Sequence, residues 1–262
     1  MKRSTFYYVK ERLNKPDQDS TLKDMIQTIA IKHKRRYGYR RMVLALRNEH
    51  GLIVNHKKVI KLMRALSVQS IVRRKKYKSY KGEVGKIAPN VLNRDFTTTQ
   101  PNQKWVTDLT EFKINDRKIY LSPIMDLHTK EILSYNIGFS PNVNLVTEML
   151  DQAINVRDTT NLTIHSDQGF HYQNRSYISR LEDNQITQSM SRKGNCLDNA
   201  VIENFFGILK SEMYYTETFK SPTHFIRSLE AYIKYYNEER ISTKLKGMTP
   251  AQYHHHSLTS TI

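Results

Sequence analysis

The chain has 262 residues, with 42 Lys and Arg against 25 Asp and Glu, and a formal net charge of +17. Its 38% hydrophobic content can build one large core or two modest ones, and its single cysteine excludes both a disulfide framework and a cysteine-based zinc site. No apolar run approaches the roughly 18 residues of a membrane span, and no secretory leader is expected. We therefore expect an intracellular protein without a membrane partner, whose large basic excess favours nucleic acid.

The positive charge is concentrated in the first part of the chain. Residues 1–100 contain 25 Lys and Arg against 7 Asp and Glu, whereas residues 101–262 contain 17 against 18. The net charges are thus +18 and −1. This asymmetry favours a basic module joined to a nearly neutral globular domain over a uniformly solvated basic surface. We expect a helical DNA-binding region at 1–70, a basic linker at 71–100 and a larger domain at 101–262.

The N-terminal region has the periodicity of three short helices. The pattern predicts a helix over 21–34, a second that starts after Gly38 and ends near Gly51, and a third over 56–66 capped by Asn55. Such an arrangement is typical of a helix-turn-helix, although a plain helical bundle gives the same pattern. The outer face of the third helix would carry His56, Lys57, Lys58, Lys61 and Arg64.

Residues 71–100 lack a helical period and are rich in Lys and Arg, with Gly and Pro interruptions. They are expected to form an extended linker that follows a phosphate backbone. A spacer without contacts remains the alternative.

The remainder predicts a mixed α/β sheet. Three strand-like runs separated by turn residues favour an antiparallel meander, and helices then alternate with short strands. The expected strands cover 104–114, 118–127, 132–139, 162–165 and 186–190, and the expected helices cover 144–157, a segment from 174, 197–214 and 221–236.

Three carboxylates are notable for their positions in or next to apolar segments. Asp108 lies within the first strand, Asp167 follows a short buried strand, and Glu203 lies in the apolar stretch AVIENFFGIL. A carboxylate in such a place costs free energy unless it is paired, protonated or bound to a metal. With few Cys or His nearby, the set favours Mg²⁺ or Mn²⁺ over zinc. The alternative is that each acid faces solvent at the edge of an element.

The sequence motifs around these residues are similar to those of a known family. Asp167 and Glu203 are separated by 35 residues, and they lie in HSDQG and in SRKGNCLDNAVIENFF, while Asp108 lies in WVTDLT. The set resembles the DDE transposases of bacterial insertion sequences, in particular the OrfB product of the frameshifted two-frame family. YGYRR, VNHKKV and MTPAQY also resemble segments of that family, so the resemblance covers about residues 20–255.

The resemblance implies a ribonuclease-H-like, integrase-type core with a mixed five-stranded sheet behind a small all-α helix-turn-helix domain. It implies that Asp108, Asp167 and Glu203 are catalytic and bind two Mg²⁺ ions, with Mn²⁺ as a substitute. The expected reaction is cleavage and transfer of DNA strands at the ends of an insertion sequence. The expected DNA contacts are Lys210, Asn199, Arg192, Lys193, Lys57, Lys58, Lys61, Arg40 and Arg41.

For Asn199, orientation of Glu203 or simple helix capping is an alternative to a DNA contact. The expected partners are the element ends, target DNA, an upstream-frame OrfA-type product that is either separate or fused, and further copies of the chain. The expected location is cytoplasmic, at the nucleoid. The rival functions are a non-catalytic DNA-binding regulator of transposition and a true ribonuclease H. The lone Trp105 is expected in the core, and His254, His255 and His256 in a solvated tail.

Overall fold

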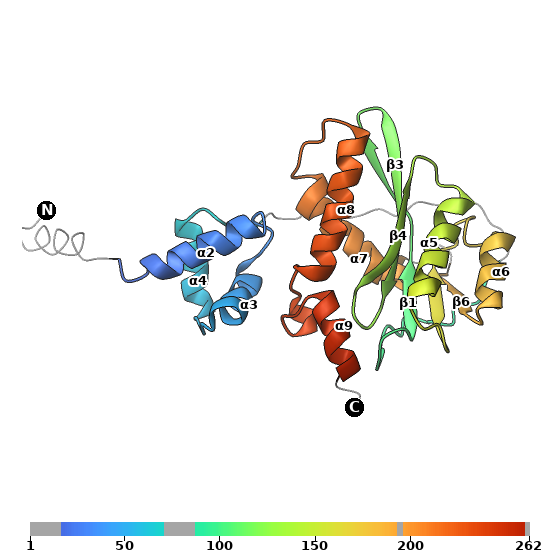
Figure 1. Cartoon of the computed structure of the whole chain (residues 1–262), viewed down its shortest axis with the longest axis horizontal. Helices are drawn as coiled ribbons and strands as arrows, with labels where there is room; N and C mark the ends of the chain where they lie inside the picture. Colours follow the sequence, from blue (N-terminus) through green and yellow to red (C-terminus); the bar gives the residue numbers. More distant parts are fainter. Residues whose placement is uncertain (1–16, 71–86, 193–195, 260–262) are drawn as a thin grey trace, which may run out of the picture. The chain divides into compact units, whose positions relative to one another are not determined.

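The computed structural model describes residues 17–70, 87–192 and 196–259, and divides the chain into two compact units, Met1–Ile71 and Val72–Ile262 (Figure 1). Much of the expected linker, residues 71–86, lies outside the described residues, as does Lys193. No helix in the described part of the chain is long and apolar enough to cross a membrane.

In its described residues, 17–70, the first unit has three helices, as predicted. They are α2 (Ser20–Lys32), α3 (Tyr39–His50) and α4 (His56–Ala65). Two ends are set by the expected residues: Gly51 takes the left-handed conformation (φ 66°) after α3, and the Asn55 side chain accepts from Lys57 N at 2.9 Å to cap α4. The apolar stripes meet in a small core of Ile26, Ile29, Met42, Leu46, Val59, Leu62 and Met63.

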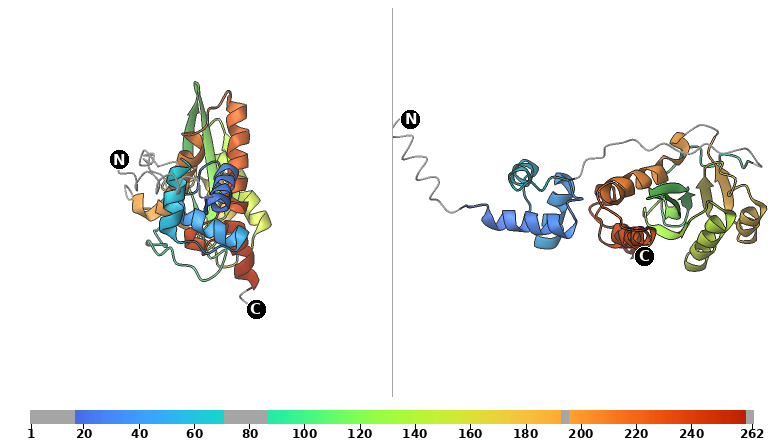
Figure 2. Two further views of the ribbon diagram at one scale, coloured as in Figure 1. Left: turned by 90° about the vertical axis from the view of Figure 1, so that its left-hand side faces the viewer. Right: turned by 90° about the horizontal axis from the view of Figure 1, so that it is seen from above.

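The second unit is a mixed sheet covered by helices on both faces (Figures 1 and 2). The strands are β1 (Lys104–Thr107), β2 (Thr110–Ile114), β3 (Arg117–Asp126), β4 (Ile132–Gly138), β5 (Thr163–Ser166) and β6 (Thr187–Met190). The helical elements are α5 (Val143–Val156), α6 (Arg175–Asp183), η1 (Cys196–Asn199), α7 (Ala200–Leu209), η2 (Lys210–Tyr214), α8 (Pro222–Glu238), η3 (Thr243–Leu245) and α9 (Pro250–Thr259).

The sheet has the predicted topology, with one strand split in two. β1 and β2 pair with β3 antiparallel in one continuous register, Trp105 opposite Asp126 and Thr110 opposite Leu121. They are therefore two halves of one strand, interrupted only at residues 108 and 109. β4 pairs antiparallel with the other edge of β3, whereas β5 pairs parallel with β1, and β6 with β5. The sheet in the described residues has six strands, and it matches the expected five-stranded mixed sheet when β1 and β2 are counted as one.

Each face of the sheet has its own core because successive strand residues point to opposite faces. Val106 and Phe112 belong to the cluster under α7 and α8, whereas Trp105 and Ile164 belong to the cluster under α5 and α6. Trp105 is fully buried, as expected. By the same alternation, the position of Asp108 falls on the side of α7.

Two predictions in the C-terminal part are wrong in detail. The helix expected over 197–214 is a 3-10 turn, an α-helix and then a wider π-helical turn in succession. The expected solvated tail is instead the helix α9, in which His255 and His256 are exposed as expected. His254 is part-buried there, with its Nε2 2.8 Å from Nη1 of Arg157. Helix periodicity alone did not indicate this contact, because its partner lies 97 residues earlier.

Candidate active site

Asp108 lies at the interruption between β1 and β2. Its side chain is only 6% exposed, and its Oδ1 accepts a hydrogen bond from Leu109 N at 2.7 Å. The pairing with β3 is interrupted at residues 108 and 109 and resumes with β2. The strand therefore presents a nearly buried carboxylate at its centre, rather than the apolar side chain that the surrounding pattern predicts.

Asp167 follows the neighbouring parallel strand. The last β1–β5 pair is Val106 with His165, and Asp108 and Asp167 each come two residues later. Because parallel strands end at the same edge of a sheet, the two carboxylates emerge side by side. Asp167 Oδ1 accepts from Gly169 N at 2.8 Å, and a Cβ on Gly169 would lie 2.9 Å from that oxygen. A side chain at position 169 would therefore require the Asp167 carboxylate and the His171 ring to move.

Glu203 lies in the first turn of α7, where its carboxylate is half-buried and favourably placed near the positive end of the helix. The residues around it, Ile202, Phe205 and Phe206, belong to the core beneath the helix. Within the described part of the chain, no three Asp, Glu, His or Cys side chains are close enough to hold a metal ion as they stand. The three carboxylates thus share one region without forming a closed ligand set.

Electrostatics links the three acids to one another. Burial, Asp167 and Glu203 raise the pKa of Asp108 well above its usual value. Burial raises the pKa of Asp167, and burial with the charge of Asp167 raises the pKa of Glu203. Burial lowers the pKa of Lys210 to about 8, although Asp108 and Glu111 oppose that change. The region therefore has an excess of negative charge that a cation relieves.

Lys210 and Asn199 lie beside this region in different ways. The Lys210 ammonium lies over the Phe112 ring, 5.1 Å from its centroid, at the point where α7 widens into η2. Asn199 is buried, makes no capping bond for α7, and donates from Nδ2 to Thr107 O at 3.1 Å. Asn199 therefore fixes the backbone before Asp108, and the structure gives it no exposed surface for DNA.

Other predicted DNA contacts lie on the first unit. Lys57, Lys58 and Lys61 are exposed on the outer face of α4, and Lys58 pairs with Asp19 at 2.5 Å. Arg40 is exposed at the start of α3. Arg41 is part-buried instead. Its Nη1 donates to the Arg36 carbonyl at 3.2 Å, and its guanidinium lies 5.7 Å from the Tyr37 ring centroid, so it supports the fold of this unit.

Sequence reasoning missed three residues at this region. Tyr172 is fully buried near both aspartates, whose charges add to burial in raising the pKa of its phenol. Asp198 is a buried carboxylate that binds Arg192 and Arg94. Asp198 lies in the motif CLDNA, next to Asn199, and this position was the feature of the sequence that could have indicated it. Nothing local to the sequence indicated Tyr172 or Arg94.

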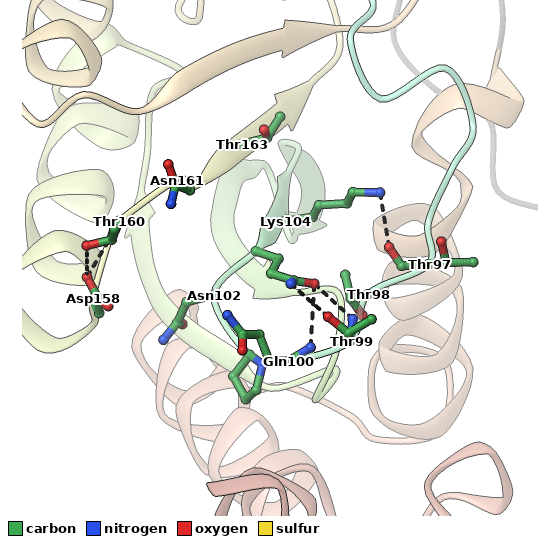
Figure 3. Close-up of a pocket in the computed structure, with 12 residues that line it drawn as sticks. Thr97, Thr98, Thr99, Gln100, Asn102, Lys104, Asp158, Thr160, Asn161 and Thr163 are labelled. Atoms are coloured by element: carbon green, nitrogen blue, oxygen red, sulfur yellow. Dashed lines mark hydrogen bonds between the residues drawn. The ribbon is translucent and has the colours of Figure 1, made fainter. Parts of the chain in front are cut away.

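A pocket of about 610 Å³ lies away from these acids, at the amino ends of β1 and β5 (Figure 3). Its polar groups pair with one another. Gln103 Oε1 accepts from Thr99 N at 2.8 Å, Lys104 Nζ donates to Thr97 O at 3.0 Å, and Thr160 Oγ1 donates to Asp158 at 2.7 Å. Since the carboxylates lie at the opposite strand ends, this pocket is not part of the candidate site.

Comparison with known proteins identifies the class of fold. Two family models described as Integrase core domain match residues 98–196 and 203–258, and an HTH-like domain matches residues 16–76. The structure is similar to a chain of the simian T-cell lymphotropic virus intasome in complex with PP2A regulatory subunit B56 gamma. That match has a TM-score of 0.54 and 18% identity over 88% of this chain and 74% of the other. The second unit is a ribonuclease-H-like integrase core.

The relatives define the family. The chain is 50% identical over 252 residues to the putative transposase InsK of insertion sequence IS150 from Escherichia coli K12, covering 96% of this chain and 89% of that protein. It is 42% identical to the probable transposase of IS1353 from Shigella flexneri, covering 97% of this chain and 50% of that protein. The chain belongs to the transposases of insertion sequences. It is an integrase-type enzyme that binds DNA and acts in DNA transposition and integration.

Proposed function

We propose that Asp108, Asp167 and Glu203 are the catalytic residues that cleave and transfer DNA strands at the ends of an insertion sequence. The observation that carries this proposal is that three carboxylates, at the ends of β1 and β5 and in the first turn of α7, have raised pKa values. Burial is the main cause at each, and the charge of Asp167 adds to it at Asp108 and Glu203. Asp198, by contrast, is a buried carboxylate whose bonds from Arg192 and Arg94 hold its pKa well below the usual value.

A divalent metal fits this donor set. Its donors are carboxylate oxygens, their mutual repulsion favours a cation, and hard oxygen ligands suit Mg²⁺ and Mn²⁺. Asp108, Asp167 and Glu203 would hold the metal, with two ions expected. When bound, the metal supplies Lewis-acid activation of the attacking hydroxyl and stabilises charge on the phosphoryl oxygens.

The residues around the triad hold it in place and attract the substrate. Asn199 fixes the Thr107 backbone, and Gly169 permits the close turn at Asp167. Lys210, which is part-buried over Phe112, adds positive charge toward a phosphate backbone. The exposed lysines of α4 would bind the element end through its phosphates, because a helix of this kind enters the major groove.

The proposed function also implies partners for the chain. The chain spans half of the Shigella flexneri relative, which leaves a second half of that protein unmatched. This supports an upstream-frame OrfA-type product that acts with the chain, separately or fused. Holding two element ends together requires more than one copy on DNA, so a homo-oligomer is expected. DNA as the substrate gives a cytoplasmic, nucleoid-associated location.

The test is strand cleavage and joining on supercoiled DNA carrying the element's own ends, in Mg²⁺ and in Mn²⁺. Wild type and Glu203→Gln are compared, each with and without the upstream-frame product. Products in the wild-type lanes alone support the proposed function. Equal activity of Glu203→Gln contradicts the assignment of Glu203, and DNA binding without any cleavage in all lanes supports the regulator instead.

The α4 lysines give a second, separable prediction. Replacing Lys57, Lys58 and Lys61 with Gln removes up to three phosphate contacts, so the slope of log K against log salt should become shallower by up to about 2.7. Lys58 contributes least because it pairs with Asp19. Fluorescence anisotropy with an end duplex measures the slope. Lys234→Gln on α8 is the control, and an unchanged slope in the triple variant excludes a phosphate-facing α4.

A further inference from the structure

A buried carboxylate joins two distant segments beside the candidate active site. Asp198 is 0% exposed. Its Oδ1 accepts from Arg94 Nε at 2.8 Å and from Arg192 Nη2 at 3.3 Å. Its Oδ2 accepts from Asn90 Nδ2 at 3.0 Å, Arg192 N at 3.0 Å and Arg192 Nε at 3.2 Å. Both oxygens are thus saturated, and two guanidinium groups are held against one carboxylate.

This arrangement fixes the two arginines and leaves part of each in solvent. The side chains of Arg94 and Arg192 are 43% and 53% exposed. Among the described residues, Arg94 binds protein only through Nε, and Nη1 of Arg192 has no acceptor. Burial alone would raise the pKa of Asp198, but bonds from Arg192 and Arg94 outweigh it and hold that pKa well below its usual value. One anion therefore faces two cations, which leaves a net charge of +1.

Residues adjacent to Arg192 and Asp198 in the chain bind the backbone next to Asp167 and Asp108. Ser191, which precedes Arg192, donates from its backbone N to Ser166 O at 2.9 Å and accepts from Gln168 Nε2 at 2.9 Å. Ser166 and Gln168 flank Asp167. On the other side, Asn199 follows Asp198 and binds the backbone before Asp108. The two arginines are thus anchored between the aspartates and the start of α7.

We propose that Arg94 and Arg192, oriented by Asp198, form a binding site for a phosphodiester group of DNA beside the candidate triad. A guanidinium stays charged at all working pH values, and its planar fork matches two phosphate oxygens. Side chains already held in one rotamer lose less entropy when a phosphate binds. This inference rests on the proposed function in taking DNA as the substrate, and it adds Arg94, which no motif of the sequence indicated.

A purely structural role for the cluster makes a different prediction. If Asp198 only holds residues 90–94 against the segment before α7, loss of any one hydrogen-bond donor to Asp198 should change DNA binding to the same extent. Asn90 is the matched case, because it donates to the same carboxylate but carries no charge. Asn90→Ala removes one hydrogen bond to Asp198 and keeps both arginines. It therefore separates stabilisation of the loop from binding of phosphate.

The experiment measures DNA binding by the full chain without divalent metal, over a range of salt concentrations. Arg94→Gln and Arg192→Gln each retain one donor for Asp198 and remove one charge. Each should make the slope of log K against log salt shallower by about 0.9, and the double variant should bind about tenfold more weakly at 0.1 M salt. Asn90→Ala and Arg180→Gln should keep the wild-type slope. Arg180 is a suitable control because it is paired with Asp151 and similarly exposed.

Two further arms identify the source of the phosphate and guard against misfolding. An element-end duplex and a duplex of unrelated sequence are compared, and a loss confined to one assigns the site to the end or to target DNA. Arg94→Lys keeps the charge without the fork, so it should keep the slope while lowering affinity, even if Arg94→Gln lowers the melting temperature. Wild-type slopes in both Gln variants overturn the site, as does an equal loss in Asn90→Ala. Activity of Glu203→Gln in strand transfer tests the proposed function separately from this outcome.

Discussion

Asp108→Asn is expected to lower strand cleavage and strand transfer by more than about 100-fold, while DNA binding stays within about twofold of wild type. Loss of an outer-shell partner of a metal site already costs roughly 10- to 100-fold, so loss of a direct ligand should exceed that range. The substitution is nearly isosteric, and Asn can still accept the bond from Leu109 N. The strand interruption that carries the residue should therefore persist. Gel assays on supercoiled DNA measure activity, and anisotropy with an end duplex measures binding.

In the same assay, the Mg²⁺ requirement should depend on pH in the direction set by the raised pKa of Asp108. The pKa of Asp108 is raised above its usual value, so protons compete with the metal for this carboxylate up to a higher pH than at an ordinary aspartate. The half-saturating Mg²⁺ concentration should fall as pH rises through that pKa. Asp151→Asn, which removes an exposed carboxylate from α5, should behave as wild type. Wild-type activity in Asp108→Asn, or a Mg²⁺ requirement that does not change with pH, contradicts the role given to Asp108.

Local rules were enough to predict most elements of the fold. Asn55 and Gly51 set helix ends through backbone preferences that act within a few residues, and the structure places both as expected. The strand expected over 104–114 is continuous in register, but its hydrogen-bonded ladder is interrupted where Asp108 binds its own neighbour. An acidic residue in an apolar strand was the signal for a site, but the strand pattern did not indicate the break in the ladder beside it.

Contacts across long separations could not be predicted in the same way. Asp198 and Arg94 are 104 residues apart, and neither lies in a periodic pattern that would indicate the other. The expected helix over 197–214 failed for a related reason. Its last turn widens into η2, in which Glu212 is buried against Arg240 from the end of α8. Helix propensity does not show that partner, because the pair forms only when α7 and α8 pack.

That buried pair leads to the largest expected effect on stability. Glu212 and Arg240 have side chains only 9% and 5% exposed. Arg240 Nη2 and Nε lie 2.8 and 2.9 Å from the carboxylate oxygens, and Tyr232 Oη donates to the same carboxylate at 2.9 Å. Removing one partner leaves the other charge buried and unpaired. Arg240→Leu should therefore lower the free energy of unfolding by about 3–5 kcal/mol.

Urea denaturation of the full chain measures this loss, and two comparisons give it a cause. Lys234 and Glu238 form an exposed pair on the same helix α8, 3.9 Å apart, so Lys234→Leu should change stability by less than about 1 kcal/mol. The double variant Glu212→Leu/Arg240→Leu should recover much of the loss, because an apolar pair leaves no buried charge behind. If Arg240→Leu lowers the free energy of unfolding as little as Lys234→Leu does, then the Glu212–Arg240 pair does not hold the end of α7 against α8. If the double variant is no better than the single one, the loss comes from packing around Arg240 rather than from an uncompensated Glu212.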